Sequence, residues 1–450
     1  MTDLSSIVRE YREASLPALI ERDEVIRDLP SPQRFNLVEI ITGMRRSGKT
    51  FYLFQKMKQL LEAGVPREHM FHFNFADDRL SPMGPHIMDD VLNEYWRQVP
   101  EAREKGAYLF LDEVQEADQW QGFCQRVAEM EQVTLVITGS SSKLSSDEIA
   151  TQFRGRSHSH EILPLSFREY CRFAGIERID IDRGVSPRMQ TQLEGMFDRY
   201  LVEGGFPGVQ GKRAEDRIEL LQGYVRDVVA RDVADRFGRE NIRLANQFAL
   251  CGLRNTACEF STNGLVETMK ELGYTIYWEK ANRLVTLLEQ AFLFFEMPEY
   301  AVSLKPQSTA LPKVYAIDPG ITYAVSRANQ QDIGKRFETA VFLELHRRLV
   351  GRRIDTLTSY TIPDASRRKV DFLLGDALSS EPYALMQVSL ALESGKTRTR
   401  EVGSLAAAMG ATRLERGIIV TLREEERCKT DEGSIDIVPA WKWFLSSELP

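Results

Sequence analysis

Eight consecutive residues have the types and the spacing that bind phosphate. Residues 43–50 read Gly-Met-Arg-Arg-Ser-Gly-Lys-Thr and match the pattern G-x-x-x-x-G-K-[ST]. Gly43 and Gly48 let the backbone curl tightly, so that consecutive N–H groups point at phosphate oxygens. Lys49 can then place a positive charge on the β and γ phosphates, and the Thr50 hydroxyl can bind Mg²⁺. The pattern predicts a site for a nucleoside triphosphate and its magnesium ion.

The elements around this loop are those that the chemistry requires. An apolar strand is predicted before it, over residues 36–43, and an amphipathic helix after it, over residues 50–64. The residues between the two glycines, Met44, Arg45, Arg46 and Ser47, are also candidates for nucleotide binding. Two interpretations stay open for the first three: they are solvated loop residues, or they touch a neighbour or the nucleotide.

A pair of acidic residues ends a later apolar strand. The segment AYLFLDE, residues 107–113, ends in Asp112 and Glu113. Asp112 is the expected Mg²⁺ partner, through water, and Glu113 is placed to polarise the attacking water. A strand-end acid at a surface turn is the alternative, which the upstream phosphate loop disfavours. The second carboxylate predicts hydrolysis, because a site that only binds has no need of it.

A polar strand end follows the acid pair. The fourth predicted strand ends in Thr138-Gly139-Ser140-Ser141-Ser142. A polar side chain here would sit between the third strand and the γ phosphate, where it can sense the phosphate and orient water. We select Ser140 for this role. A serine-rich turn that caps a helix is the alternative.

The strands and helices that position these groups alternate along the chain. Helical patterns separate most of the predicted strands, for example over residues 119–132. Strand, crossover helix and strand in succession predict an α/β fold with a parallel sheet covered on both faces. The predicted strands span residues 36–43, 70–78, 107–113, 133–141 and 160–166.

The order of phosphate loop, acid pair and polar strand end resembles the AAA+ ATPases. More narrowly, GMRRSGKT, LFLDEVQ, ITGSSSKL and RGRSHSHEILPLSFREY resemble a bacterial and archaeal ATPase family with a DUF4143-type region after its AAA+ core. The segments EGGFP, RDVVARDV, KVYAIDPG and KVDFLL continue the resemblance more loosely, so that it covers about residues 20–390. The resemblance implies a P-loop NTPase core that hydrolyses ATP with Mg²⁺.

An arginine after the sensor strand is a candidate for action across a subunit interface. In AAA+ proteins an arginine from one subunit often completes the neighbouring site, and by resemblance Arg156 is our choice. Such an arginine stabilises charge in the phosphoryl-transfer transition state. The alternatives are a solvated loop arginine or one paired with Glu161. The interface role implies a homo-oligomer, and a ring in particular.

The middle of the chain predicts a DNA-binding element. Residues 244–301 read as three helices followed by a strand pair, with Ser261 as a helix cap, Gly273 as a break and Thr275 as a helix start. This pattern matches a helix-turn-helix, and the resemblance implies a winged helix. Exposed cations would meet DNA phosphates, or would be solvated charges balanced by neighbouring acids. They are Lys270, Lys280 and Arg283.

The C-terminal part resembles the restriction-endonuclease-like fold. Glu338 lies on a predicted helix and Asp371 in a predicted strand, whereas that chemistry needs a further carboxylate and a lysine. Gln387 and Ser389 stand at those two places, so the nuclease-like site is degenerate and we expect no cleavage. A domain that binds DNA or a partner is expected instead. The candidate DNA contacts here are Arg367, Arg368 and Lys369, with solvated turn residues as the alternative.

Length and composition set the outer limits. The 450 residues correspond to about three domains at roughly 150 residues each. The net charge of −8 excludes a uniformly basic nucleic-acid coat but not a local basic face. No apolar run reaches the roughly 18 residues of a membrane helix, no secretory signal is seen, and the five cysteines form no CxxC pair. We therefore expect a cytoplasmic protein without a membrane partner.

These inferences combine into a predicted architecture and function. We expect an ATPase that binds DNA, branched or single-stranded forms included, and remodels it or moves along it. The alternative is a nucleotide-dependent signalling or defence switch whose C-terminal domain binds a partner. A third possibility is an ATP-dependent nuclease, which Gln387 and Ser389 oppose. The predicted parts are an N-terminal helical segment (1–36), an AAA+ core (37–170), a helical domain (171–243), a winged-helix domain (244–325) and a degenerate nuclease-like domain (326–450).

Overall fold

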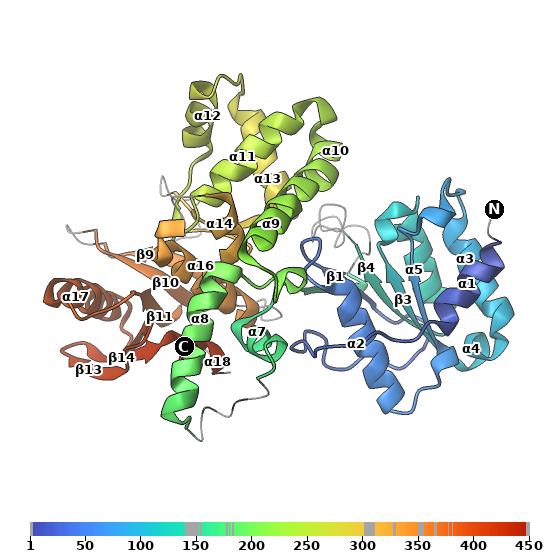
Figure 1. The fold of residues 1–450 in the computed structure, drawn as a ribbon, viewed down its shortest axis with the longest axis horizontal. Helices are drawn as coiled ribbons and strands as arrows, with labels where there is room; N and C mark the ends of the chain where they lie inside the picture. Colours follow the sequence, from blue (N-terminus) through green and yellow to red (C-terminus); the bar gives the residue numbers. More distant parts are fainter. Residues whose placement is uncertain are drawn as a thin grey trace. The chain divides into compact units, whose positions relative to one another are not determined.

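The chain forms two compact units, Met1–Leu163 and Pro164–Pro450 (Figure 1). They are seen in a computed structural model, in which Ser140 and most of the run after the fourth strand lie outside the described residues. Among the residues described, no helix combines the length and the apolar character needed to cross a membrane. The described residues are 3–139, 153, 155–176, 179, 181, 184–300, 311–326, 330–349, 355–363, 367–376, 378–379 and 381–446.

A five-stranded parallel sheet forms the centre of the first unit. Its strand order is β2-β3-β4-β1-β5, and every neighbouring pair is parallel. The parallel α/β core predicted from the sequence is therefore confirmed. The strands are β1 (Val38–Thr42), β2 (Met70–Asn74), β3 (Ala107–Asp112), β4 (Val133–Thr138) and β5 (Ser157–Glu161).

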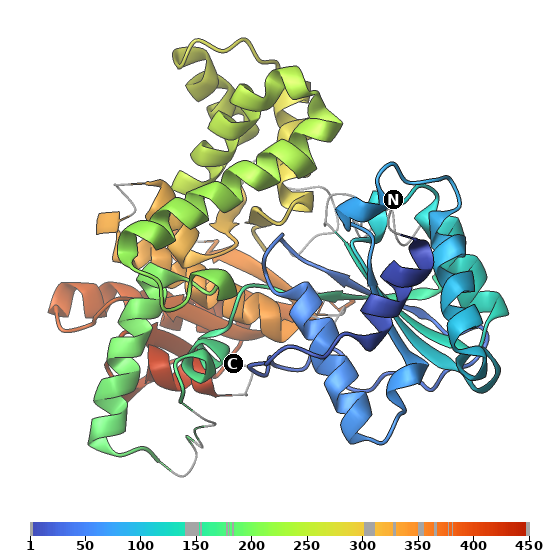
Figure 2. The ribbon, with the colours of Figure 1, turned by 45° about the vertical axis from the view of Figure 1, so that its right-hand side comes forward.

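Helices cover both faces of this sheet, as Figures 1 and 2 show. Alternate residues of β3 point to opposite faces, because side chains in a strand alternate. Phe110 packs in the core beneath α2, whereas Leu109 packs in the core beneath α1, α3 and α5. The helices are α1 (Leu4–Glu13), α2 (Lys49–Glu62), α3 (Ile87–Gln98), α4 (Pro100–Lys105) and α5 (Trp120–Met130).

The fifth strand lies earlier than the sequence predicts. We expected it over residues 160–166, but β5 is the polar stretch Ser157–Glu161. An edge strand pairs on one side only, here with β1, and can therefore be polar and partly exposed. The apolar run that suggested a strand begins at Ile162, which is buried in the core beneath α2.

The N-terminal segment is helical only in part. Helix α1 ends at Glu13, and no helix forms over residues 14–37. Prolines disfavour a helix in this stretch, and side chains of α2 satisfy its backbone instead. The Arg22 N–H donates to Gln55 Oε1 at 2.7 Å, and the Ile26 N–H donates to Tyr52 Oη at 2.9 Å. The prediction of a helical segment over residues 1–36 is wrong beyond α1.

The second unit begins with helices and a small sheet. Ser261 caps α12, as predicted, by accepting a hydrogen bond of 2.8 Å from the Gly264 N–H. The next helix begins at Trp278, with Tyr277 as its N-cap, and not at Thr275. The elements are α7 (Phe167–Phe173), α8 (Pro187–Glu203), α9 (Ala214–Val228), a π-helical turn (Val229–Val233), α10 (Ala234–Phe237), α11 (Ile242–Arg254), β6 (Cys258–Glu259), α12 (Thr262–Glu271), α13 (Trp278–Gln290), β7 (Phe294–Met297) and β8 (Lys313–Ala316), and the antiparallel sheet order is β6-β8-β7.

A mixed six-stranded sheet completes the second unit. Its order is β13-β14-β12-β11-β10-β9, with parallel pairs at β11–β12 and β12–β14 and antiparallel pairs elsewhere. A C-terminal α/β domain was predicted, and the mixed sheet agrees with it. The elements are α14 (Pro319–Val325), α16 (Ile333–Leu349), β9 (Asp355–Thr361), β10 (Lys369–Asp376), β11 (Pro382–Val388), α17 (Gly395–Thr412), β12 (Arg416–Thr421), β13 (Glu426–Thr430), β14 (Gly433–Pro439) and α18 (Ala440–Leu445).

Two of the looser sequence motifs contact each other. Asp318, from KVYAIDPG, accepts hydrogen bonds from the Gly205 N–H at 2.5 Å and the Ile321 N–H at 3.0 Å. Gly204 has a φ of +74°, and a Cβ there would lie 2.1 Å from Asp318 Oδ1. Only glycine fits this approach, so EGGFP and DPG form a structural junction within the second unit.

Candidate functional site

The phosphate loop, residues 43–50, connects the end of β1 to the start of α2. Gly43 and Gly48 have φ values of +141° and +106°, and a Cβ on Gly43 would lie 2.3 Å from the Ile162 carbonyl oxygen. The loop therefore requires glycine at both positions. The ammonium of Lys49 is buried against the loop and donates to the carbonyls of Gly43 at 2.9 Å and Met44 at 3.2 Å.

The residues between the glycines differ in exposure. Met44 is completely buried, so it is not a solvated loop residue. Arg45 lies 3.9 Å from the Glu113 carboxylate, whereas Arg46 is exposed and has a φ of 69°. Ser47 is buried, and its Oγ has no hydrogen-bond partner within the part of the chain that is described. An unsatisfied buried hydroxyl beside a phosphate loop suits a phosphate oxygen.

Asp112 is completely buried at the end of β3 and meets the loop directly. Thr50 Oγ1 donates to its Oδ2 at 2.6 Å, and Thr138 Oγ1 donates to its Oδ1. Burial alone would raise the pKa of Asp112, but interactions with His72, Thr138 and Thr50 outweigh it and lower the pKa. An ionised carboxylate next to a hydroxyl is a ligand set that Mg²⁺ accepts, so these residues fit the ion.

Glu113 follows in a left-handed backbone conformation, with a φ of 52°. Its N–H donates to Thr138 Oγ1 at 3.3 Å. Its carboxylate accepts a hydrogen bond of 2.5 Å from Gln115 Nε2 and faces Arg45 of the phosphate loop at 3.9 Å. The structure thus brings the loop, Asp112 and Glu113 together at the carboxyl ends of β1 and β3, which lie on either side of β4.

The polar residue that reaches the acid pair from β4 is Thr138. Ser140, our predicted sensor, lies outside the described residues, and its role stays a prediction. Thr138 contacts both the Asp112 carboxylate and the Glu113 N–H. The sequence offered a signal for it, because Thr138 is a polar residue at the end of a largely apolar strand.

Two further residues at this site were missed from the sequence. His72 in β2 is buried, and its Nε2 lies 3.9 Å from Asp112 Oδ2. Arg22 is also buried and donates to the carbonyls of Ser47 and Leu163, each at 2.8 Å. The sequence could have indicated His72, because a histidine stands inside the aromatic strand MFHFN. Nothing near Arg22 in the sequence indicated a role in supporting the phosphate loop.

Arg156 lies just before β5 and is exposed at its tip. Its side chain is 56% exposed and forms an ion pair with Glu129 on α5. A surface ion pair of this kind is weak and can exchange partners. The proposed action across a subunit interface stays a prediction.

The candidate DNA-binding residues of α12 and α13 already have intramolecular partners. Lys270 pairs with Glu267 at 2.9 Å. Lys280 donates to Asn241 Oδ1 at 2.9 Å, and Arg283 donates at 2.8 Å to a backbone carbonyl of α10. Any DNA phosphate would compete with these contacts.

The second basic cluster lies at the start of β10. Lys369 forms an ion pair with Glu259 of β6. Arg368 donates at 3.2 Å to a backbone carbonyl of α17, and Arg367 has a φ of 46°. Their contact with DNA stays a prediction.

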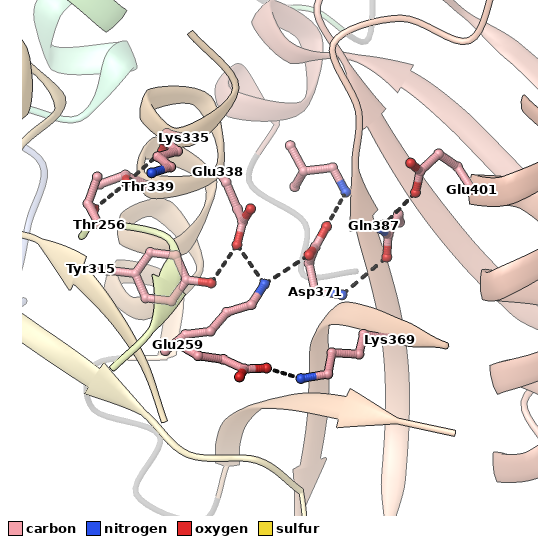
Figure 3. Close-up of polar contacts among 12 residues, drawn as sticks. Thr256, Glu259, Tyr315, Lys335, Glu338, Thr339, Lys369, Asp371, Gln387 and Glu401 are labelled. Carbon is pink, nitrogen blue, oxygen red and sulfur yellow. Dashed lines mark hydrogen bonds and ion pairs between the residues drawn. The ribbon is translucent and has the colours of Figure 1, made fainter. Parts of the chain in front are cut away.

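The nuclease-like residues meet within the second unit, as Figure 3 shows. Glu338 on α16 and Asp371 on β10 face each other across an ammonium group. This group belongs to Lys313 of β8, whose Nζ lies 2.8 Å from Glu338 Oε1 and 3.0 Å from Asp371 Oδ1. The sequence gave no indication that Lys313 would reach this cluster.

The two departures from the nuclease pattern are structural as well. Gln387 accepts a hydrogen bond of 3.1 Å from the Asp371 N–H and donates to Glu401 Oε2 on α17 at 2.9 Å. Ser389 is buried and donates to a nearby backbone carbonyl at 3.1 Å.

Comparison with known families supports the ATPase core. Residues 36–171 match the model of a family described as an AAA domain. Residues 194–332 match a domain of unknown function, DUF8612. The DUF4143-type region expected from the sequence is not confirmed, because DUF8612 is found in its place.

The chain is similar to two proteins without an assigned function. An uncharacterised protein of Methanocaldococcus jannaschii is 29% identical over 435 residues, which cover 95% of this chain and 91% of the relative. An uncharacterised protein of Haemophilus influenzae is 26% identical over 357 residues, which cover 79% of this chain and 86% of the relative. Among solved structures, a Walker-type ATPase of Pyrococcus abyssi has a TM-score of 0.40 at 14% identity and covers 64% of this chain and 90% of its own.

Proposed function

We propose that this protein hydrolyses ATP at the site formed by the phosphate loop, Asp112 and Glu113. The observation that carries the proposal is the 2.6 Å contact between Thr50 and Asp112, which joins the loop to the acid pair. Lys49 moves from the loop carbonyls to the β and γ phosphates, because a triphosphate offers it a stronger, charged partner. Mg²⁺, when bound, neutralises negative charge on the phosphates beside Thr50 and Asp112.

Glu113 polarises the attacking water. Its carboxylate is 19% exposed and is oriented by Gln115, so it is held rather than freely rotating. A fixed carboxylate at this place takes the water proton as the water attacks the γ phosphorus, and the bond from that phosphorus to the bridging oxygen breaks, so that ADP leaves. Thr138 forms a hydrogen bond with each of the two acidic residues and so fixes their position relative to β4. Ser140 remains our candidate for sensing the γ phosphate.

We also propose that the active form is a homo-oligomer, a ring in which Arg156 reaches the site of the neighbouring subunit. What supports this is the exposure of Arg156 and its pairing with a single surface acid. A guanidinium delivered there stabilises the charge that develops on the transferred phosphoryl group.

We propose that the energy of ATP hydrolysis is used to remodel DNA or to move along it, so that the protein is a DNA motor. Support comes from the order α11, β6, α12, α13, β7, β8, which is the order of a winged helix. We propose that the second unit comprises a helical domain (171–243), a winged-helix domain (244–325) and a degenerate nuclease-like domain (326–450). Lys270, Lys280 and Arg283 then exchange their internal partners for DNA phosphates.

The internal pairing of those same cations favours a second candidate function. In it, the nucleotide state controls assembly, and the second unit binds a protein partner. ATP turnover measured with single-stranded, duplex and branched DNA, at low and moderate salt, separates the two. If the protein is a DNA motor, DNA should increase its rate of ATP turnover, and it should bind DNA more weakly at higher salt. If DNA does not change the rate of ATP turnover at any salt concentration, only the switch is left.

A further inference from the structure

Three elements of the second unit meet at one buried ammonium group (Figure 3). Lys313 opens β8, Glu338 lies on α16 and Asp371 lies on β10. The three side chains are only 14%, 18% and 14% exposed. Charges that are largely removed from water are costly unless they are paired, and one cation here pairs with two carboxylates.

Each of the two acids also accepts a hydrogen bond from a second group. Tyr315 Oη donates to Glu338 Oε1 at 2.8 Å, and the Val388 N–H donates to Asp371 Oδ2 at 3.1 Å. Burial alone would lower the pKa of Lys313, but the charges of Asp371 and Glu338 outweigh it and raise the pKa. The lysine is therefore a firmly held cation.

A second contact keeps β8 against α16. Thr256 Oγ1 lies 2.8 Å from Thr339 Oγ1 and accepts a hydrogen bond of 3.1 Å from the Ala316 N–H. Both threonines are completely buried. Because Thr339 follows Glu338 on α16 and Ala316 ends β8, the backbone that carries Lys313 is tied to the backbone that carries its partner.

The ammonium lies where a metal ion could bind, because two carboxylates converge on it. Carboxylates from two elements that converge on one cation form the kind of oxygen site that Mg²⁺ and Mn²⁺ bind. A divalent ion and an ammonium cannot occupy the same few ångströms between two carboxylates, because they repel each other and compete for the same oxygens.

We infer that Lys313 is a built-in cation that fills the divalent-metal position between Glu338 and Asp371 and closes this site to metal. The site then joins β8 to the C-terminal sheet as an ion-pair junction. It lacks metal-dependent chemistry for this reason, in addition to the presence of Gln387 and Ser389. The inference does not depend on ATP hydrolysis in the first unit.

The test measures Mn²⁺ binding to the full-length protein without nucleotide. The electron paramagnetic resonance signal of free Mn²⁺ reports how much of the ion stays unbound. We expect Lys313→Met to bind one more Mn²⁺ ion per chain than the wild type. The dissociation constant for this added ion should be at least tenfold lower than that of any Mn²⁺ that the wild type binds at the same position. Adding Asp371→Asn to Lys313→Met should remove that ion. Lys313→Arg, which keeps the cation, should behave like the wild type.

Two results would overturn the inference. One is a wild-type protein that already binds Mn²⁺ in a way that Asp371→Asn abolishes. The other is a folded Lys313→Met protein that gains no ion. Lys369→Met, which breaks the more exposed ion pair with Glu259, is the matched control and should gain none.

Loss of Lys313 leaves two buried carboxylates facing each other, so Lys313→Met can fail to fold. In that case the triple variant Lys313→Met/Glu338→Gln/Asp371→Asn decides. If the lysine acts as a compensating cation, the triple variant should refold, with the circular dichroism spectrum of the wild type. A triple variant that stays unfolded would show that Lys313 does something other than fill a cation position, and would overturn the inference.

Discussion

The hydroxyl of Thr50 donates a 2.6 Å hydrogen bond to the buried carboxylate of Asp112. The two residues are 62 positions apart and come from the first turn of α2 and the end of β3. This contact joins the phosphate loop to the acid pair, at the place where we propose that Mg²⁺ binds.

Thr50→Ala should raise the Mg²⁺ concentration needed for half-maximal ATP turnover by about 10–100-fold. The hydroxyl is both a ligand candidate and the group that orients Asp112. Thr50→Ser keeps the hydroxyl and should stay close to the wild type. Turnover measured across a Mg²⁺ titration checks this, and an unchanged titration curve for Thr50→Ala would remove Thr50 from the metal site.

Glu113→Gln should keep nucleotide binding and lower turnover by about 10²–10⁴-fold, because the amide cannot accept the water proton. The matched control is Glu116→Gln in the same turn, which should turn over normally. Binding of a fluorescent ATP analogue and release of phosphate are the two readouts. Normal phosphate release by Glu113→Gln would mean that the base lies elsewhere.

Mixing subunits tests the arginine. Arg156→Ala and Lys49→Ala proteins should each be inactive, and a mixture should recover part of the turnover, because an intact site then meets an intact arginine across the interface. In comparable enzymes, such an arginine increases the catalytic rate by about 10³–10⁵-fold. A mixture as inactive as its components would place Arg156 within its own subunit or outside the reaction.

Arg22→Met should weaken nucleotide binding and lower the thermal stability of the first unit. Its guanidinium holds the carbonyls of Ser47 and Leu163, and charged hydrogen bonds of this kind contribute about 1.5–3 kcal/mol each. Arg27→Met, at an exposed position of the same stretch, is the control. Nucleotide titration and a melting curve serve as readouts, and equal behaviour of the two variants would contradict the role of Arg22.

The stability of the second unit should fall as the pH rises from about 4.5 to about 7. Burial and the nearby charge of Glu296 raise the pKa of Glu289 to about 7, from an ordinary value of 4.5. A folded-state pKa above the unfolded one means that the folded protein binds the proton more tightly, so deprotonation costs stability.

Glu289→Gln should therefore stabilise the protein at pH 8, by up to about 3 kcal/mol, and change little at pH 4.5. Urea unfolding at the two pH values measures this. Glu271→Gln, at an exposed position of α12, should have no such effect. A Glu289→Gln gain of the same size at both pH values would contradict the assigned pKa.

Much of the ATPase core could be predicted because its signals are local. Gly43 and Gly48 mark the turn, an apolar run marks each inner strand, and Asp112 and Glu113 end one of those runs. The edge strand β5 was misplaced because a strand with one neighbour does not need an apolar sequence. The N-terminal stretch was misread as helix, because its backbone partners are the side chains of Gln55 and Tyr52 on α2.

By itself, the sequence determined the phosphate loop, the acid pair and the parallel order of strand and helix, since each depends on residues close together in the chain. Only the tertiary structure decided that Thr138 reaches Asp112 and that Lys313 fills the space between Glu338 and Asp371. Those partners are separated by 26, 25 and 58 residues. Strand order and helix packing bring them together, and no local pattern of residues encodes a contact over such a distance.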